Sequence, residues 1–484
     1  MFAILEKKDM LANIENITRS FVLLGVIEVI VLLLQMLRVL PSFNQYFRYT
    51  GTFDNPAILA MVIALCMPIC VFHVLKTTGK NQMSWYTLIV FFLLTLLVLE
   101  SRTCIIAGLC ASFIVICSEK NLFYYFKSNR RLNFVVVIGA VLLFTILYLY
   151  KRDSADGRIL LWAVSLRMIA QKPLFGWGND GISSSFMPNQ ALFLHDYSNA
   201  HFSHLADNVS HPFNEFLSFG IKYGISGLFI LLCLMFLFLK MTLSIKSLHH
   251  RSLYFGLLSV LLIISMFSYP CKIPVIWIIS TFLVCSVISS YCICFVKVRK
   301  LAIILLTICF SWILIHNKHI YDEWKWQVLQ ISSMPVKEAH QKYNSLYIKL
   351  SNNPSFLYNY GAWLHHNGYY PESLKILSEC KNRFDDYNVE MLMADNYKEL
   401  GCPQKAINLF EYANSMVPSK FLPLYYEMVT YENEKDYANA YRIAEIIKSK
   451  PTKVAKSPSV KKIKNEAVLL MQKLNHLKRE RHDK

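Results

Sequence analysis

Three side chains in polar parts of this sequence are of types that bind anions or move protons. Arg158 follows Asp156, a good helix N-cap, so we expect Arg158 in a first turn, where free backbone N–H groups favour an anion. His211 precedes Pro212, which suits the first helical position, and this predicts a histidine at a second helix cap. Arg102 directly follows an apolar run. Guanidinium groups bind phosphate oxygens and an imidazole accepts protons near neutral pH, so these residues predict an active site.

Two of these residues, Arg158 and His211, lie in Asp156–Gly227, the one long polar interval within a hydrophobic first part of the chain. Function tends to sit where polar residues persist between membrane spans. The interval contains PLFGWGNDG, a Gly-rich turn that lacks the Gly-Lys-Ser/Thr of a phosphate loop. Asn214 lies one helical turn after His211, where it can fix the local turn, orient the imidazole or contact the substrate.

The elements around this interval are apolar runs of membrane-crossing length. The chain has 484 residues, is 55% hydrophobic and has a positive mean hydropathy. Runs of about 15–22 apolar residues recur, which is the length that crosses a bilayer as a helix. We predict an all-α polytopic membrane protein with about nine transmembrane helices. The predicted spans are Ser20–Leu40, Ala57–Leu75, Trp85–Leu99, Thr103–Cys117, Phe134–Tyr150, Leu217–Leu239, Leu253–Phe267, Pro274–Phe295 and Leu301–Ile315.

The basic residues of the short loops predict the orientation of these spans. Every second loop is rich in Lys and Arg, and such loops stay in the cytoplasm. We therefore expect a cytoplasmic N-terminus, with the loop 151–217 and everything after Ile315 outside. The basic loops hold Lys76 and Lys80, then Lys120, Lys127, Arg130 and Arg131, then Lys240, Lys246 and Arg251, and last Lys297, Arg299 and Lys300.

After the last predicted span, the composition becomes that of a soluble domain. From about Pro354 a weak repeat of about 34 residues appears, which is the tetratricopeptide period. We expect a membrane domain over 1–316, a linker or helical connector over 317–353 and an α-solenoid over 354–484 with a basic tail. Such repeats bind a protein partner or their own membrane domain. The net charge of +18 comes largely from cytoplasmic loops and this tail, which favours the bilayer as partner and disfavours nucleic acid.

Five segments of the sequence resemble one known superfamily. They are TGTFDNPAILA at Thr50–Ala60, ESRTCIIAG at Glu100–Gly108, GRILLWAVSLRMIAQKPLFGWG at Gly157–Gly178, HPFNEFLSFGIKYGISGL at His211–Leu228 and SMFSYP at Ser265–Pro270. They resemble the O-antigen ligase superfamily, which includes O-antigen ligases, O-antigen polymerases and bacterial protein O-oligosaccharyltransferases. The resemblance covers roughly Ser20 to Phe295. Members usually carry further membrane helices before the first segment, so we expect a shorter N-terminal part here.

The resemblance implies a glycosyltransferase at the periplasmic face of the bacterial inner membrane. It would move a glycan from an undecaprenyl-diphosphate carrier to a hydroxyl of lipid A-core or of a protein Ser or Thr. In that reaction Arg102 and Arg158 would hold the diphosphate where its charge develops, and His211 would take the acceptor proton. The donor arrives already activated, so no cofactor or metal is needed. A repeat domain that docks an acceptor favours a ligase or protein glycosyltransferase over the alternative, an O-antigen or capsular polysaccharide polymerase.

Other interpretations of the same residues stay open. Arg102 can extend towards the membrane interface and His211 can be a plain helix cap. His195, His201 and His204 with Asp207 suggest a zinc site, although only His201 and His204 are close in sequence and no thiolate accompanies them. A transporter would need polar residues inside the spans, which are almost absent. A membrane-anchored repeat scaffold for envelope assembly would tolerate alanine at the Arg–Arg–His set.

Overall fold

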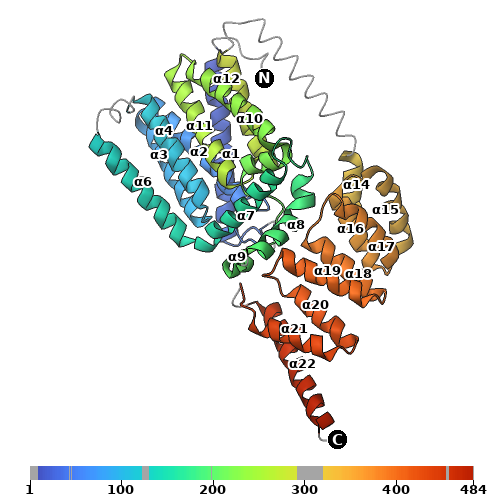
Figure 1. Ribbon diagram of the computed structural model, residues 1–484. Coiled ribbons are helices and arrows are strands. Elements are labelled where there is room, and N and C mark those ends of the chain that lie inside the picture. Colours follow the sequence, from blue (N-terminus) through green and yellow to red (C-terminus); the bar gives the residue numbers. More distant parts are fainter. Residues whose placement is uncertain are drawn as a thin grey trace. The chain divides into compact units, whose positions relative to one another are not determined.

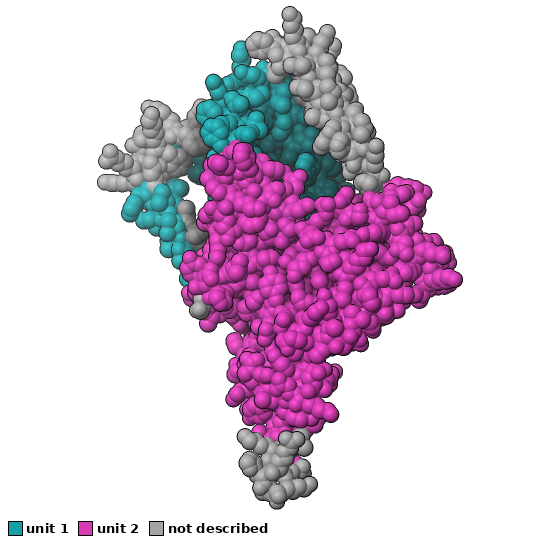
Figure 2. Space-filling model, turned by 45° about the vertical axis from the view of Figure 1, so that its right-hand side comes forward, with its two compact units in different colours: residues 1–151, 213–216, 228–310 teal, residues 152–212, 217–227, 311–484 magenta. Residues whose placement is uncertain are grey.

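The computed structural model describes residues 9–42, 44, 46–120, 122, 130–197, 199–291, 320–453 and 457–482. Every regular element in these ranges is a helix, so the predicted all-α class is confirmed. The chain divides into two compact units, which Figure 2 shows in two colours. Unit 1 comprises residues 1–151, 213–216 and 228–310, and unit 2 comprises residues 152–212, 217–227 and 311–484.

Unit 1 is a bundle of long apolar helices (Figure 1). Its centre is α2, in which every residue from Leu59 to Val74 is buried and which packs against α1, α3, α4, α11 and α12. A helix that is apolar on all sides has to be surrounded by other helices. The elements of unit 1 are α1 (Asp9–Met36), α2 (Pro56–Lys76), α3 (Gly79–Val98), α4 (Arg102–Glu119), α6 (Arg130–Tyr150), α10 (Glu215–Leu243), α11 (Leu248–Phe267), η2 (Pro270–Lys272) and α12 (Pro274–Tyr291). The bend of α10, residues 217–227, belongs to unit 2.

The predicted membrane spans correspond to these helices. In the described part of the chain, α1, α2, α3, α4, α10, α11 and α12 are long and apolar enough to cross a bilayer, which confirms a polytopic membrane protein. The predicted span Phe134–Tyr150 coincides with α6, and its crossing of the membrane stays a prediction. The predicted span Leu301–Ile315 lies outside the described residues.

Unit 2 combines the polar interval with the C-terminal helices. Each helix from α14 to α22 packs against the next one along the chain, as the succession in Figure 1 shows. Gly368 and Gly401, which share a position in the predicted repeat, both have a positive φ in the turn after a helix. The tetratricopeptide class itself stays a prediction. The elements of unit 2 are α7 (Arg152–Gln171), α8 (Gly181–Asp196), α9 (Ala200–Leu205), α14 (Ile320–Ile331), α15 (Val336–Leu350), α16 (Pro354–His366), α17 (Tyr370–Lys381), α18 (Tyr387–Glu399), α19 (Pro403–Met416), α20 (Leu422–Asn433), α21 (Tyr437–Ser449) and α22 (Pro458–His482).

Candidate active site

The segment Thr50–Thr52 is held by two buried polar side chains of α1. Gln35 Oε1 accepts hydrogen bonds from the backbone N–H of Thr50 and of Gly51, both at 3.0 Å, and Gln35 Nε2 donates to Gly51 O at 2.8 Å. Glu28 accepts from the Thr52 N–H at 2.9 Å and from the Thr52 hydroxyl at 2.5 Å. Both side chains lie inside a predicted span, where a polar group is costly unless it is bonded. A carboxylate within an apolar run was the signal that could have identified Glu28.

A cavity of about 680 Å³ opens beside this segment in unit 1. Two arginines, Arg38 and Arg48, line it together with apolar side chains that include Val39, Leu40 and Phe47. The described lining contains no carboxylate, so its charge is positive. The sequence did not single out either arginine, because Arg38 falls within the predicted span Ser20–Leu40 and Arg48 lies just before the first motif segment. In the structure α1 ends at Met36, so Arg38 follows the helix.

Three of the motif segments meet in unit 1. Asn55 caps α2 by accepting from the Ala57 N–H at 2.8 Å, and its Nδ2 donates to the Tyr269 hydroxyl at 3.3 Å. The Tyr269 ring lies edge-on to Phe213, with ring centroids 5.6 Å apart. Glu215 Oε1 accepts from the backbone N–H that follows Pro270 at 2.9 Å. The NP, HPFNE and SYP motifs therefore form one connected group.

Arg102 is the first residue of α4 and is half-buried. Glu100, two residues earlier, has a φ of 50°, which is uncommon outside glycine and marks a sharp change of chain direction before α4. The Glu100 carboxylate forms an ion pair with Lys151 at the end of α6. The ESR motif thus forms the entry to a span, as the sequence predicts.

The helix that carries Arg158 begins earlier than predicted. Asp156 is not an N-cap, because α7 starts at Arg152 and Asp156 lies in its second turn. The Arg152 guanidinium, one turn earlier, approaches Asp156 Oδ2 at 3.4 Å, an i,i+4 pair that supports the extra turn. Arg158 is therefore beyond the first turn, and the free N–H groups of a helix start do not account for an anion there.

Asp156 has a second partner that the sequence did not predict. His201 Nε2, on α9, lies 3.0 Å from Asp156 Oδ2, and Asp156 is only 7% exposed. This pair places His201 on a carboxylate two residues before Arg158. No group of three His, Cys, Asp or Glu side chains in the described ranges is arranged to hold a metal ion. A residue pair 45 positions apart has no local signal in a single sequence.

The glycine-rich turn after α7 is bonded to the bend of α10, backbone to backbone. Trp177 N–H donates to Ile221 O at 2.7 Å and Ile225 N–H donates to Pro173 O at 2.7 Å. At this crossing Gly176 and Gly224 have φ angles of 70° and 67°. A Cβ on Gly176 would lie 2.4 Å from Ile221 O. Only glycine fits such a close approach of two backbones. The glycines of the third and fourth motif segments therefore allow these two segments to pack against each other.

His211 is not a helix cap. The helix after it, α10, begins at Glu215, and His211 lies in a bend four residues earlier. Phe213 has a φ of 52°, so the chain between Pro212 and Asn214 is not helical. His211 is half-buried, its Nδ1 lies 2.8 Å from Ser210 Oγ, and it does not lie at a helix N-terminus. Asn214, only 8% exposed, directly precedes α10.

The four predicted site residues divide between the units. Arg158 and His211 belong to unit 2, whereas Arg102 and Asn214 belong to unit 1. His211 and Asn214 lie on the same short stretch of chain, in which the division falls after Pro212. The catalytic and substrate-binding roles of these residues stay predictions.

Comparison with known proteins matches residues 87–232 to the family described as O-antigen ligase. A candidate polysaccharide ligase of Rickettsia felis is 31% identical over 134 residues, which are 28% of this chain and 31% of that protein. Similar proteins of Rickettsia conorii and Rickettsia typhi are 29% and 30% identical over 28% and 25% of this chain, and 31% and 29% of their own lengths. The matched region thus spans about a third of these relatives. The chain is a polytopic membrane protein, and its residues 87–232 are similar to the O-antigen ligase family.

Proposed function

We propose that this protein is a glycosyltransferase of the O-antigen ligase type, which takes its glycan from an undecaprenyl-diphosphate carrier. The observation that carries the proposal is the family match over residues 87–232, which contains Arg102, Arg158, His211 and Asn214. The acceptor is a hydroxyl of lipid A-core or of a protein Ser or Thr. A lipid-linked donor resides in the bilayer, and the long apolar helices of unit 1 are of the length that crosses it.

The bonds, electrons and protons of the transfer step are accounted for by these residues and the two substrates. The acceptor oxygen forms a bond to the anomeric carbon, the bond from that carbon to the diphosphate breaks, and the electron pair leaves with the lipid diphosphate. The acceptor proton passes to His211. When Nδ1 of the neutral ring donates to Ser210 Oγ, the ring lone pair that takes a proton is on Nε2. Arg102 and Arg158 stabilise the diphosphate charge as it develops, and Arg38 and Arg48 add positive charge in unit 1.

One contact supports an external position for both the loop and the C-terminal helices. Ser419 Oγ donates to Ala206 O at 2.7 Å, so these two parts of the chain lie on one side of the membrane. Three described spans, α10 to α12, separate them along the chain, and the sequence predicts the fourth at Leu301–Ile315. Together with the basic loops, this contact supports an inner-membrane protein with its N-terminus in the cytoplasm and unit 2 in the periplasm.

Reconstituted transfer tests this proposal. Purified protein in liposomes with a lipid-linked glycan is offered lipid A-core, an acceptor protein or a second lipid-linked glycan, and the product identifies a ligase, a protein glycosyltransferase or a polymerase. His211→Ala should bind the donor but lower transfer by about 10²–10⁴-fold, the usual scale of general base catalysis. Arg158→Ala should weaken donor use and slow transfer, and Arg158→Lys should restore only part, because ammonium lacks the planar fork.

The matched control is His195→Ala, on the same interval. The His195 side chain is 85% exposed, and it contacts the neighbouring Asp196. This variant should transfer normally. Near-normal transfer by His211→Ala, in protein that is inserted and bound to donor, would remove the base from the mechanism. Activity should persist after a chelator is added, because the donor is already activated.

A further inference from the structure

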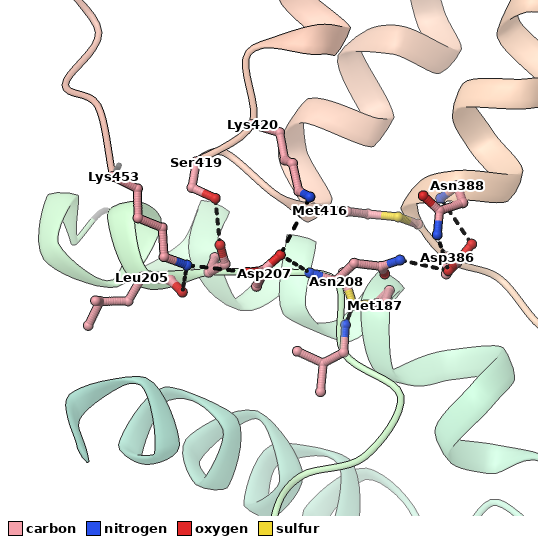
Figure 3. Close-up of polar contacts among 12 residues, drawn as sticks. Met187, Leu205, Asp207, Asn208, Asp386, Asn388, Met416, Ser419, Lys420 and Lys453 are labelled. Carbon is pink, nitrogen blue, oxygen red and sulfur yellow. Dashed lines mark hydrogen bonds and ion pairs between the residues drawn. The ribbon is translucent and has the colours of Figure 1, made fainter. Parts of the chain in front are cut away.

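The chain that leads to His211 is bonded along its backbone to parts of unit 2 outside that segment. Between Leu205 and Asp207, each of the three successive carbonyl groups accepts a hydrogen bond from a distant side chain. The donors are Lys453 Nζ to Leu205 O at 3.1 Å, Ser419 Oγ to Ala206 O at 2.7 Å and Gln190 Nε2 to Asp207 O at 3.1 Å. Two of these donors belong to the C-terminal helical region, as Figure 3 shows.

Gln190 is the central link of this contact. Its side chain is fully buried on α8, and its Nε2 donates one hydrogen to Asp207 O and the other to Met416 O at 2.8 Å, at the end of α19. A single amide thus bonds the loop to the repeat helices. A buried backbone carbonyl that loses its hydrogen-bond donor is left with an uncompensated desolvation free energy. Loss of the Gln190 side chain should therefore destabilise this contact.

Side-chain contacts continue in the same place. Asn208 Nδ2 donates to Asp386 Oδ2 at 2.8 Å, and Asp386 itself caps α18 by accepting from the Asn388 and Val389 N–H groups. Asp386 is 4% exposed and Asn208 is half-buried, so their bond is partly shielded from water. Asp207 faces two lysines, with Lys453 at 3.4 Å and Lys420 at 3.8 Å.

A second set of contacts joins the start of α8 to the turn between α17 and α18. Asp385 N–H donates to Ser183 O at 3.0 Å, and the Arg383 guanidinium lies 3.5 Å from Asp180. The contact therefore extends from the start of α8 to Gln190 and continues at Leu205–Asn208. His211 follows Asn208 by three residues. This short connection is not helical and bends at Ser210 and His211.

We propose that the C-terminal repeat helices α18, α19 and the turn before α20 are a positioning element of the transfer site, which holds Leu205–Asn208 and thereby fixes His211. The inference rests on the proposed function, in which His211 is the general base. A base must lie within hydrogen-bond reach of the acceptor hydroxyl, and a misplacement of about 1 Å can cost about 10²-fold in rate. The bend around His211 is short and polar, so its position follows from the segment to which it is tied. The repeat region then contributes to turnover without touching the substrate.

The test removes the central link and measures both position and turnover. Gln190→Leu keeps the side-chain volume but deletes both donations, so we expect kcat to fall about 10–10²-fold while the KM for the lipid-linked donor stays within about twofold. Hydrogen exchange at the amides of residues 209–211 should become faster by at least about tenfold. In a His211→Ala background, Gln190→Leu should cause no further loss, because the base that it positions is absent.

A milder variant and a control accompany this test, in case Gln190→Leu does not insert or fold. Asn208→Ala removes the bond to Asp386 but leaves the α18 cap intact, and it should lower kcat about 3–10-fold. Gln404→Ala deletes an exposed hydrogen bond to Asn408 within α19 and should leave transfer and exchange unchanged.

The outcomes separate this inference from the proposed function. Normal kcat in Gln190→Leu and Asn208→Ala, beside an inactive His211→Ala, overturns the positioning role and leaves the general base in place. A further loss of rate when Gln190→Leu is added to His211→Ala also overturns it. Normal transfer by His211→Ala refutes the base, and with it the positioning role, whatever the exchange data show.

Discussion

Substituting Gly224 by alanine should disrupt the crossing between the glycine-rich turn and α10. Gly224 has φ 67° and ψ −166°, a backbone region that essentially only glycine occupies. A Cβ there would lie 2.3 Å from Leu174 O and 2.6 Å from Pro173 O, which are backbone atoms that cannot rotate away. The same two carbonyls accept hydrogen bonds from Ser226 and Ile225, so moving them breaks the crossing itself.

The size of the effect follows from two contributions. Holding a non-glycine residue in this backbone region costs on the order of 1–3 kcal/mol. Relief of the clash separates the two segments, and each backbone hydrogen bond that is lost costs about 1 kcal/mol. The Ile225-to-Pro173 bond at 2.7 Å and the Ser226-to-Leu174 bonds are the ones at risk. The total is roughly 3–5 kcal/mol, which is a large part of the stability of a typical domain.

Two glycines of the same region serve as controls. Gly178 has a φ of 82° but nothing within 4 Å of a Cβ, so Gly178→Ala should show strain alone, about 1–2 kcal/mol. Gly157, inside α7, has neither a positive φ nor a close atom, so Gly157→Ala should be neutral or stabilising by up to about 1 kcal/mol. Limited proteolysis and thermal unfolding in detergent should show stability decreasing in the order Gly157→Ala, Gly178→Ala, Gly224→Ala. Equal stability of Gly224→Ala and Gly157→Ala would refute the close backbone crossing.

Two further predictions concern buried polar groups. Burial and the adjacent Glu390 raise the pKa of Asp385 from 3.8 to about 8, so the folded protein holds this proton more tightly than the unfolded chain. Stability should therefore fall as pH rises from about 4 to about 8, and Asp385→Asn should reduce that slope and unfold at higher temperature than the native protein at pH 8. Gln35→Leu leaves the Thr50 and Gly51 N–H groups without their acceptor and should destabilise unit 1 by at least about 2 kcal/mol, measured by thermal unfolding, whereas Gln35→Glu keeps the acceptor and should cost less.

The fold was predictable because its signal is local. A bilayer-length apolar run is sufficient to indicate a spanning helix, since no other backbone conformation satisfies its polar groups in lipid. The seven spans found in the described chain follow from such runs. The helix starts near the site were wrong for equally local reasons. Asp156 was given the N-cap role although Arg152, one turn earlier, pairs with it and extends α7. Pro212 was predicted to start a helix, but the positive φ of Phe213 is not helical, and α10 begins only at Glu215.

The contacts of the site were not predictable, because they join residues far apart in the chain. Gln190 reaches Met416 across 226 positions, and Asn55 reaches Tyr269 across 214. A single sequence carries no signal for such pairs. The close backbone approach at Gly224 has no sequence signal other than the glycine itself, which is one of several in its motif. The motifs correctly indicated which segments are rich in polar and small residues. The contacts that these residues make became visible only in the structure.

These long-range contacts determine how mutations in this protein have to be interpreted. Four of the five motif segments are bonded to one another, so a substitution in one of them disturbs the others whether or not the residue takes part in chemistry. Loss of transfer alone therefore does not identify a catalytic group. Residues that act as a unit give non-additive effects, and a residue that positions the base loses its effect once the base is gone. His211→Ala combined with a substitution at Gln190 or at Gly224 distinguishes the two cases. The first pair should be no worse than His211→Ala, whereas Gly224→Ala should lower the yield of folded protein in either background.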